Sequence, residues 1–433
     1  MRFRVDFEPL RVPAYRRYFL AWSVALTAGW IFGTTQSWTF LQSSGTAAAV
    51  AYLPIVLVLP VPVALVIGGI LTDRRGPRTV LVFAQVATGL TIGSIGLLAA
   101  THNLTFWPTL VAGALLGTFG GLGSVPGQAI MVRLVERRLV ASAYALSLMT
   151  YGIGRLIGGP LGGTIVQSVG AAPAFALSAC GFLVAAAMFR TLPKVDGLQA
   201  AATGLSRQDL ADAVGWARGM PNVVAIVALE AVAAGLIGPY QAVMPVIARD
   251  VLHGGPTDLG LLIAAGGVGV VLGGALMGPL GARIGHGRFL VCAVAGSICG
   301  IATLSISTSL VVSCVLVALA AGADNSSALT RGLLLQTVSP ARLRGRVLAL
   351  NGVVSAVASP ACLLAVGLLV ERFGATPIIL GMASLAGSAL VAVTVTHRSL
   401  LSLSVQGTHA QEDAAAAAEA AMSEAAIAAD ART

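Results

Sequence analysis

The chain has 433 residues, of which 57% are hydrophobic and only 10% are charged, and its formal net charge is +9. Soluble domains carry about 25% charged residues, so this composition cannot cover a surface that faces water. This composition excludes a disordered chain, a secreted disulfide scaffold and a nucleic-acid-binding domain. The positive net charge does not indicate a nucleic-acid partner, because basic residues between apolar spans instead fix the orientation of the spans in the membrane.

A short basic segment, residues 1–17, comes first and is expected to be cytoplasmic. The next apolar run is too long for a signal peptide, so we expect it to be retained. Twelve apolar stretches follow, each near the length of about 20 residues that a transmembrane helix needs. They are residues 18–41, 47–71, 79–101, 106–132, 141–168, 172–190, 222–248, 258–281, 289–307, 309–331, 345–370 and 375–396.

Basic residues collect in the turns on one side of these spans. With a cytoplasmic N-terminus, 23 of the 26 Lys and Arg lie inside, and Arg331 is counted in the inner turn after the tenth span. The outer turns hold Arg249 and Arg372, and Arg155 lies within the fifth span. This asymmetry predicts a multi-pass protein of the cell membrane, with both termini in the cytoplasm.

The sequence also contains an internal repeat. An offset of 209 relates the residues around Gly69 and Gly76 to those around Gly278 and Gly285. An offset of 204 relates residues 138–173 to residues 342–377. We therefore predict an all-α polytopic membrane protein, in which twelve transmembrane helices form two pseudo-symmetric six-helix halves, residues 18–190 and 222–396.

Two segments lie outside these halves. In the cytoplasmic linker 191–221, Ser206 and Asp209 resemble a capping box, which predicts an amphipathic helix on the membrane surface or a plain linker helix. The tail, residues 397–433, is rich in Ala and carries five acidic residues, which argue against a thirteenth span. We expect it to be a loose cytoplasmic segment.

The turn between the second and third spans resembles the signature loop of the major facilitator superfamily, G-x-L-x-D-R-x-G-x-R. The matching residues are Gly69, Leu71, Asp73, Arg74, Gly76 and Arg78. The resemblance extends over about residues 18–396 and implies the major facilitator fold with a site at the membrane midplane, an architecture that is a known example of inverted repeats.

Three further segments resemble the secretion-effector branch, which contains enterobactin exporters and macrolide-efflux-like proteins. They are Pro9 to Phe19, Pro126-Gly127-Gln128-Ala129 and Arg344-Gly345-Arg346. The chain departs from the family pattern at Ala282, where the second-half loop lacks the acid, and in the fourth span, which lacks the arginine of many proton-coupled members.

The resemblance implies a gating role for the signature loop. Asp73 would face Arg344 and Arg346 at the start of the eleventh helix, where the helix dipole and two guanidinium groups attract a carboxylate. Together with Arg74 and Arg78, this contact would latch the outward-open state. The alternative is a tight turn, formed by Gly69 and Gly76 and flanked by arginines that fix the topology.

A glycine-rich cluster in the fifth span resembles the exporter motif of the family. It consists of Gly158, Gly159, Pro160, Gly162 and Gly163, with a spacing one residue short of the motif. The alternative is close helix packing with a kink at the proline.

Three ionisable residues lie deep in apolar spans: Glu230, Asp324 and Arg155. An isolated charge at such depth costs at least about 2.5–3.5 kcal/mol, so these groups should face a wet cavity or pair with one another. We expect Glu230 to carry a proton, Asp324 to bind substrate or a proton, and Arg155 to be their charge partner. A purely structural pair is the alternative.

No enzyme signature, phosphate-binding loop or metal-ligand spacing occurs, and the five cysteines form no CxxC, so we expect no catalysis, cofactor or metal. The sequence favours a monomeric secondary transporter that exports a small amphipathic organic molecule by proton antiport, with protons and the lipid bilayer as its other partners. An importer or symporter of the same fold, or a membrane subunit that moves no solute, remain the alternatives.

Overall fold

The computed structural model describes residues 7–44, 47–193, 214–340 and 343–403. The described residues form helices and short turns, with no strand among them, and the all-α prediction is confirmed. The helices of the first half are η1 (Glu8–Arg11), α1 (Pro13–Ser44), α2 (Ala47–Val58), α3 (Val61–Arg75), α4 (Pro77–Ala100), α5 (Phe106–Arg133), η2 (Arg137–Leu139), α6 (Val140–Val169) and α7 (Ala171–Arg190).

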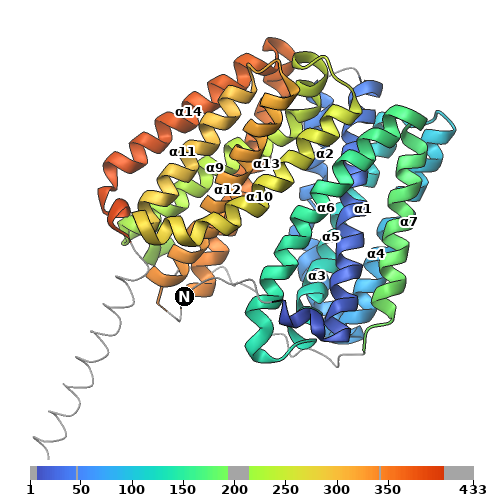
Figure 1. The fold of residues 1–433 in the computed structure, drawn as a ribbon, viewed down its shortest axis with the longest axis horizontal. Helices are drawn as coiled ribbons and strands as arrows, with labels where there is room; N and C mark the ends of the chain where they lie inside the picture. Colours follow the sequence, from blue (N-terminus) through green and yellow to red (C-terminus); the bar gives the residue numbers. More distant parts are fainter. Residues whose placement is uncertain (1–6, 45–46, 194–213, 341–342, 404–433) are drawn as a thin grey trace, which may run out of the picture.

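The second half repeats this arrangement (Figure 1). Its helices are α9 (Pro221–Val246), η3 (Ile247–Val251), α10 (Pro256–Ile284), α11 (His286–Leu304), α12 (Leu310–Val338), α13 (Arg344–Phe373), α14 (Ala375–Thr396) and η4 (Arg398–Ser402). The linker residues Ser206 and Asp209 and most of the tail lie outside the described residues, although residues 214–218 at the end of the linker are helical.

Ten spans in the described part of the chain are long and apolar enough to cross a membrane, and α1 and α6 are not among them. Both helices carry polar groups away from lipid: α1 buries Thr34, Thr35 and Gln36, and α6 buries Arg155. The described residues therefore confirm ten of the twelve predicted spans by length and hydropathy, and the full count of twelve stays a prediction.

Two of the predicted boundaries change. The tenth span was expected to end at Arg331, but α12 continues to Val338. The placement of Arg331 in an inner turn is therefore wrong: this residue is only 2% exposed and lies about two turns inside the helix, or about 10 Å from its end. The apolar residues Leu333 to Leu335 carry the helix past the buried charge.

The second span is broken into α2 and α3 at Leu59 and Pro60 (Figure 1). Pro60 and Pro62 have no N–H, so the helix loses two of its backbone hydrogen bonds at this point. The two pieces have different neighbours. α2 packs against α13 of the second half, whereas α3 packs mainly against α5 of its own half.

The internal repeat is visible in the turns. All described glycines with positive φ form two pairs at the offsets found in the sequence: Gly76 with Gly285, and Gly170 with Gly374. Their φ angles of 80°, 88°, 96° and 84° lie in the region that glycine adopts without steric cost. Each pair connects the same two helices in its own half, at α3–α4 and α10–α11 or at α6–α7 and α13–α14.

The halves meet mainly through α6 with α10 and through α2 with α13. We call the face where α1 begins and α14 ends the termini side, and the opposite face the far side. The halves lie together toward the far side and diverge toward the termini side (Figure 1). On the far side, Gln167 of α6 accepts a hydrogen bond from the backbone N–H of Thr257 of α10 at 3.2 Å.

Exposure of the side chains between the halves follows the same division. On α12, Val317 and Ala321 lie on the far side of Asp324 and are buried, whereas Ala328 on its termini side is exposed. On α6, Gly158 is buried, whereas Tyr151 on the termini side is 44% exposed. The helices of the two halves therefore lie together on the far side and diverge toward the termini side (Figure 1).

Candidate functional site

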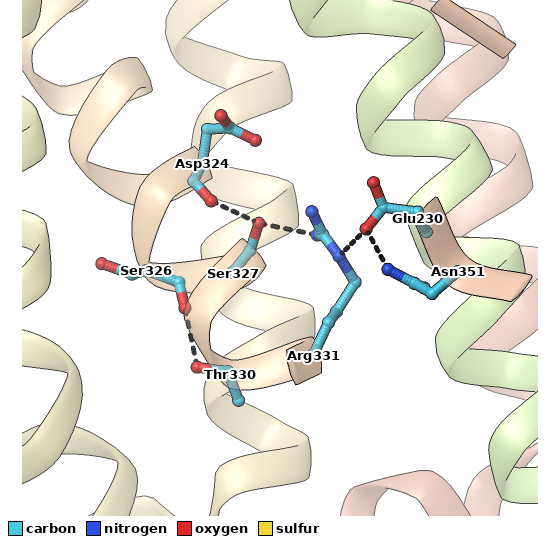
Figure 2. Close-up of polar contacts among 7 residues, drawn as sticks. All are labelled: Glu230, Asp324, Ser326, Ser327, Thr330, Arg331 and Asn351. Carbon is cyan, nitrogen blue, oxygen red and sulfur yellow. Dashed lines mark hydrogen bonds and ion pairs between the residues drawn. The ribbon is translucent and has the colours of Figure 1, made fainter. Parts of the chain in front are cut away.

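A buried ion pair connects α9 with α12. The Arg331 Nε donates to Glu230 Oε2 at 2.7 Å, and the side chains of Arg331 and Glu230 are 3% and 12% exposed. The same carboxylate oxygen accepts from the Asn351 amide of α13 at 3.2 Å, and Arg331 Nη1 donates to the Ser327 hydroxyl at 2.8 Å. Figure 2 shows that these contacts join three helices of the second half.

The structure thus brings Glu230 to Arg331 rather than to Arg155. The sequence contains a pattern that indicates a role for Arg331, but the predicted end of the tenth span at this residue placed it in a turn. Asp324, Ser327 and Arg331 recur at spacings of three and four, so they share one face of a helix that extends beyond Arg331. Asn351 gave no signal, because a single uncharged amide in an apolar span is unremarkable from sequence alone.

Asp324 lies at the centre of α12 and is partly exposed. Its backbone carbonyl accepts from the Ser327 hydroxyl at 2.8 Å, while its carboxylate points away from Ser327 and Arg331 (Figure 2). Within the described ranges, no hydrogen bond or ion pair engages this carboxylate. Among the predicted groups, Asp324 is the acid that a ligand can still reach.

Arg155 lies at the middle of α6, at the contact with the second half, and is 3% exposed. Its Nε donates to the Ile263 carbonyl of α10 at 2.9 Å, and its guanidinium lies 5.1 Å from the centre of the Trp30 ring. It also interacts electrostatically with Asp324 and Tyr240. Arg155 is therefore a link between the two halves, next to Asp324 but already bound to backbone and ring.

Polar groups on the far side of this region are buried without partners in the part of the chain that is described. The Gln36 amide nitrogen and the Trp38 indole nitrogen belong to this set. Trp22 and Trp30, which the sequence also suggested as cavity-lining residues, are partly exposed.

The glycine cluster of α6 has two faces. A Cβ atom on Gly158 or Gly162 would collide with the α1 backbone at Thr27 or Ile31. A Cβ atom on Gly159 or Gly163 would collide with α10, at Ile263 and Gly260 or at the Pro256 carbonyl. The cluster therefore lets α6 pack closely between α1 of its own half and α10 of the other, around Pro160 inside the helix.

The signature residues do not form a loop. Helix α3 continues through Asp73 and Arg74 to Arg75, and only Gly76 forms the turn. Asp73 and Arg74 are exposed, and Asp73 has no hydrogen bond or ion pair with Arg344 or Arg346 in the described residues.

Arg78 is engaged elsewhere. Its Nη1 donates to the Leu192 carbonyl at 2.7 Å, just past the end of α7. A Cβ atom on Gly69 would meet open space, so this glycine is not explained by packing in this structure. The end of α3 at Asp73 and the start of α13 at Arg344 are therefore not joined by a hydrogen bond or ion pair among the described residues.

Comparisons with known proteins give a consistent result. A family model described as transmembrane secretion effector matches residues 5–430. The enterobactin exporter EntS of Salmonella choleraesuis (strain SC-B67) is 25% identical over 350 residues, which cover 77% of this chain and 80% of that protein. The multidrug efflux pump Tap of Mycolicibacterium fortuitum is 24% identical over 371 residues, covering 81% and 88%.

Solved structures share the fold. The nucleoside transporter NupG, as a D323A mutant, superposes with a TM-score of 0.70 at 10% identity and covers 89% of this chain and 99% of its own. A bacterial homologue of the human lysosomal transporter Spinster, solved inward-facing and unoccupied, gives a TM-score of 0.64 at 15% identity, covering 93% and 98%. At these identities the likeness concerns architecture alone.

Proposed function

Because the chain belongs to the transmembrane secretion effector family of the major facilitator superfamily, and is thus a polytopic membrane transporter, we propose that it exports a small amphipathic organic molecule in exchange for protons. EntS and Tap are named as an exporter and an efflux pump, which supports export as the direction. The proposed setting is the cell membrane, with both termini in the cytoplasm, so that the termini side is the cytoplasmic side.

The observation that carries this proposal is the free carboxylate of Asp324. It lies halfway along α12, beside the junction of the halves, and is partly exposed. A carboxylate without a fixed partner can bind a proton or a ligand without breaking an existing ion pair. Asp324 is therefore the favoured proton site.

Glu230 has a different role in this mechanism. Its carboxylate is held by Arg331 and Asn351, and all three residues belong to the second half. The network keeps α9, α12 and α13 together while the half moves as a unit. The sequence favoured Glu230 as the proton carrier. Because Glu230 is held in an ion pair with Arg331, Asp324 is now the favoured proton carrier.

Alternating access then follows from the two interfaces. In this structure α6–α10 and α2–α13 close the far side, and the signature residues around Asp73 are apart from α13. In the opposite state the far side opens, and Asp73 approaches Arg344 and Arg346 as the latch that the family resemblance implies.

The experiment measures export in everted vesicles under an imposed proton gradient, with substrates chosen from a panel of antibiotics and secreted metabolites that expressing cells fail to accumulate. Asp324→Asn should lose gradient-driven transport. Glu230→Gln, which keeps a hydrogen-bonding group, should retain pH-dependent transport at a reduced rate. Glu136→Gln, in an exposed loop, is the matched control.

Full transport by Asp324→Asn with an unchanged pH profile would exclude this proton site. Substrate uptake into intact cells, driven by the inward proton gradient, would instead indicate an importer. A panel in which expression changes no compound's accumulation would favour the subunit that moves no solute.

The orientation has its own test. In a cysteine-free background, Thr308→Cys, in the exposed α11–α12 turn on the far side, should react with an impermeant thiol reagent in intact cells. Arg137→Cys, exposed between α5 and α6 on the termini side, should react only after permeabilisation. The reverse pattern would place the termini outside.

A further inference from the structure

One face of α6 carries Tyr144, Tyr151 and Arg155, at spacings of seven and four residues. At 100° per residue, Tyr144 and Tyr151 lie in line with the glycine edge that packs on α1, and Arg155 lies between that edge and the edge that packs on α10. The opposite face carries Ile157 and Leu161, exposed apolar side chains that suit lipid. The two tyrosines therefore face the space between the halves.

The tyrosine side chains are open to that space. Tyr144 is 51% exposed and Tyr151 is 44% exposed, while Gly162, farther along the same face, is buried. The Trp30 ring of α1 meets Tyr151 edge-on, with ring centres 5.5 Å apart. Tyr144 and Tyr151 thus form an aromatic track that leads from the termini side to Trp30.

A free negative charge lies at the end of this track. Asp324 interacts electrostatically with Tyr151. The two nearby guanidinium groups are not available to a ligand, because Arg331 binds Glu230 and Ser327, and Arg155 binds the Ile263 carbonyl and is almost fully buried. An anionic ligand would meet a carboxylate with no free cation, whereas a neutral ligand would leave that carboxylate unpaired.

We infer that the transported molecule is an aromatic cation, whose rings contact Tyr151, Tyr144 and Trp30 while its charged nitrogen binds Asp324. Aromatic faces attract cations as well as apolar rings, and a carboxylate forms its strongest hydrogen bonds with charged donors. This inference names the substrate class of the proposed exporter and so rests on that function. It also implies that substrate and proton compete for one carboxylate.

The test uses two dyes with the same xanthene ring system and opposite charge, rhodamine 6G and fluorescein. Binding to the purified full-length protein is measured by fluorescence anisotropy at pH 8, where a free carboxylate is most available to a cation. Rhodamine 6G should bind saturably and fluorescein should not. Asp324→Asn should weaken rhodamine 6G binding by about tenfold or more, the loss of one charge-assisted hydrogen bond.

Three further variants separate the ring contact from a general defect. Tyr151→Ala should weaken binding several-fold, and Tyr151→Phe should restore it, since the ring rather than the hydroxyl makes the contact. Ile157→Ala, on the opposite face of the same helix, should bind as the unmodified protein does.

Equal or tighter binding of fluorescein, no binding of either dye, or unchanged rhodamine 6G binding by Asp324→Asn would each overturn the inference. The panel of exported compounds judges the export function separately. If that panel shows efflux while the dyes fail, only the substrate class falls. If it shows none, the proposed function falls as well.

Discussion

At the scale of single residues, the Glu230–Arg331 pair joins two charged side chains that are 12% and 3% exposed. The free-energy cost of removing both charges from water offsets much of their mutual attraction. Loss of one partner, however, leaves the other charge buried and unpaired. We therefore expect Glu230→Leu to lower the free energy of unfolding by about 3–5 kcal/mol. Denaturant unfolding of the purified protein in detergent measures this change.

The double variant Glu230→Leu with Arg331→Met checks the reason. It removes both charges and should recover most of the lost stability. Glu136→Leu, at an exposed position, should leave stability unchanged. If the double variant is no more stable than Glu230→Leu alone, the cost arises from packing rather than from an orphaned charge.

The sequence was sufficient to place Glu230, Asp324 and Arg155 at membrane depth, because a charge within a long apolar run is visible without a structure. It was not sufficient to pair them. Partner choice depends on how α9, α12 and α13 pack, and no residue pattern within one helix specifies its rotation against another. Arg331 shows the limit well, since a charge near the end of a span is equally compatible with a turn and with a buried helix end.

At the scale of helices, the glycines of α6 determine how closely the halves approach. Gly163→Ala would place a methyl group against the Pro256 carbonyl of α10, a backbone atom that cannot rotate away. Overpacking of this kind costs about 1–3 kcal/mol. We expect less folded protein and weakened closure of the far side, measured by yield, melting temperature and thiol accessibility of Thr257→Cys.

Gly120→Ala in α5 is the matched control for that substitution. A Cβ atom there meets nothing within 4 Å, and alanine favours helix more than glycine does. Its stability should equal or exceed that of the unmodified protein. If both variants behave alike, close approach at Gly163 does not matter, and the cluster is explained by the kink at Pro160.

At the scale of the whole molecule, the sequence predicted an all-α chain and the internal repeat of its helices, because hydropathy and turn glycines repeat along the chain. It could not predict which side is open. The two states of an alternating-access transporter have the same amino-acid sequence, and they differ only in which helix ends are in contact. In the proposed cycle, the contact of α2 with α13 belongs to the state described here and would be lost in the opposite one.

A crosslink on the far side tests that assignment. Ile55 of α2 packs against the small cluster formed by Ala242 of α9 and Leu363 of α13. In a cysteine-free background, the pair Ile55→Cys with Leu363→Cys should form a disulfide that holds the far side closed. Transport should stop on oxidation and return with a reductant, whereas either single variant should be insensitive to both. Undiminished transport by the oxidised pair would mean that α2 and α13 do not separate during the cycle.

The four charged side chains around the junction, Glu230, Asp324, Arg155 and Arg331, cancel one another in sign. A proton or a monovalent cation on Asp324 gives the group the same net charge of +1, so a one-for-one exchange moves no net charge across the bilayer. Each uncompensated charge would be worth about 2.3 kcal/mol per 100 mV of membrane potential. Efflux of a cationic substrate should therefore survive valinomycin with potassium, which removes the potential, and stop with nigericin, which removes the pH difference. The voltage of the cell would then neither aid nor oppose this transporter.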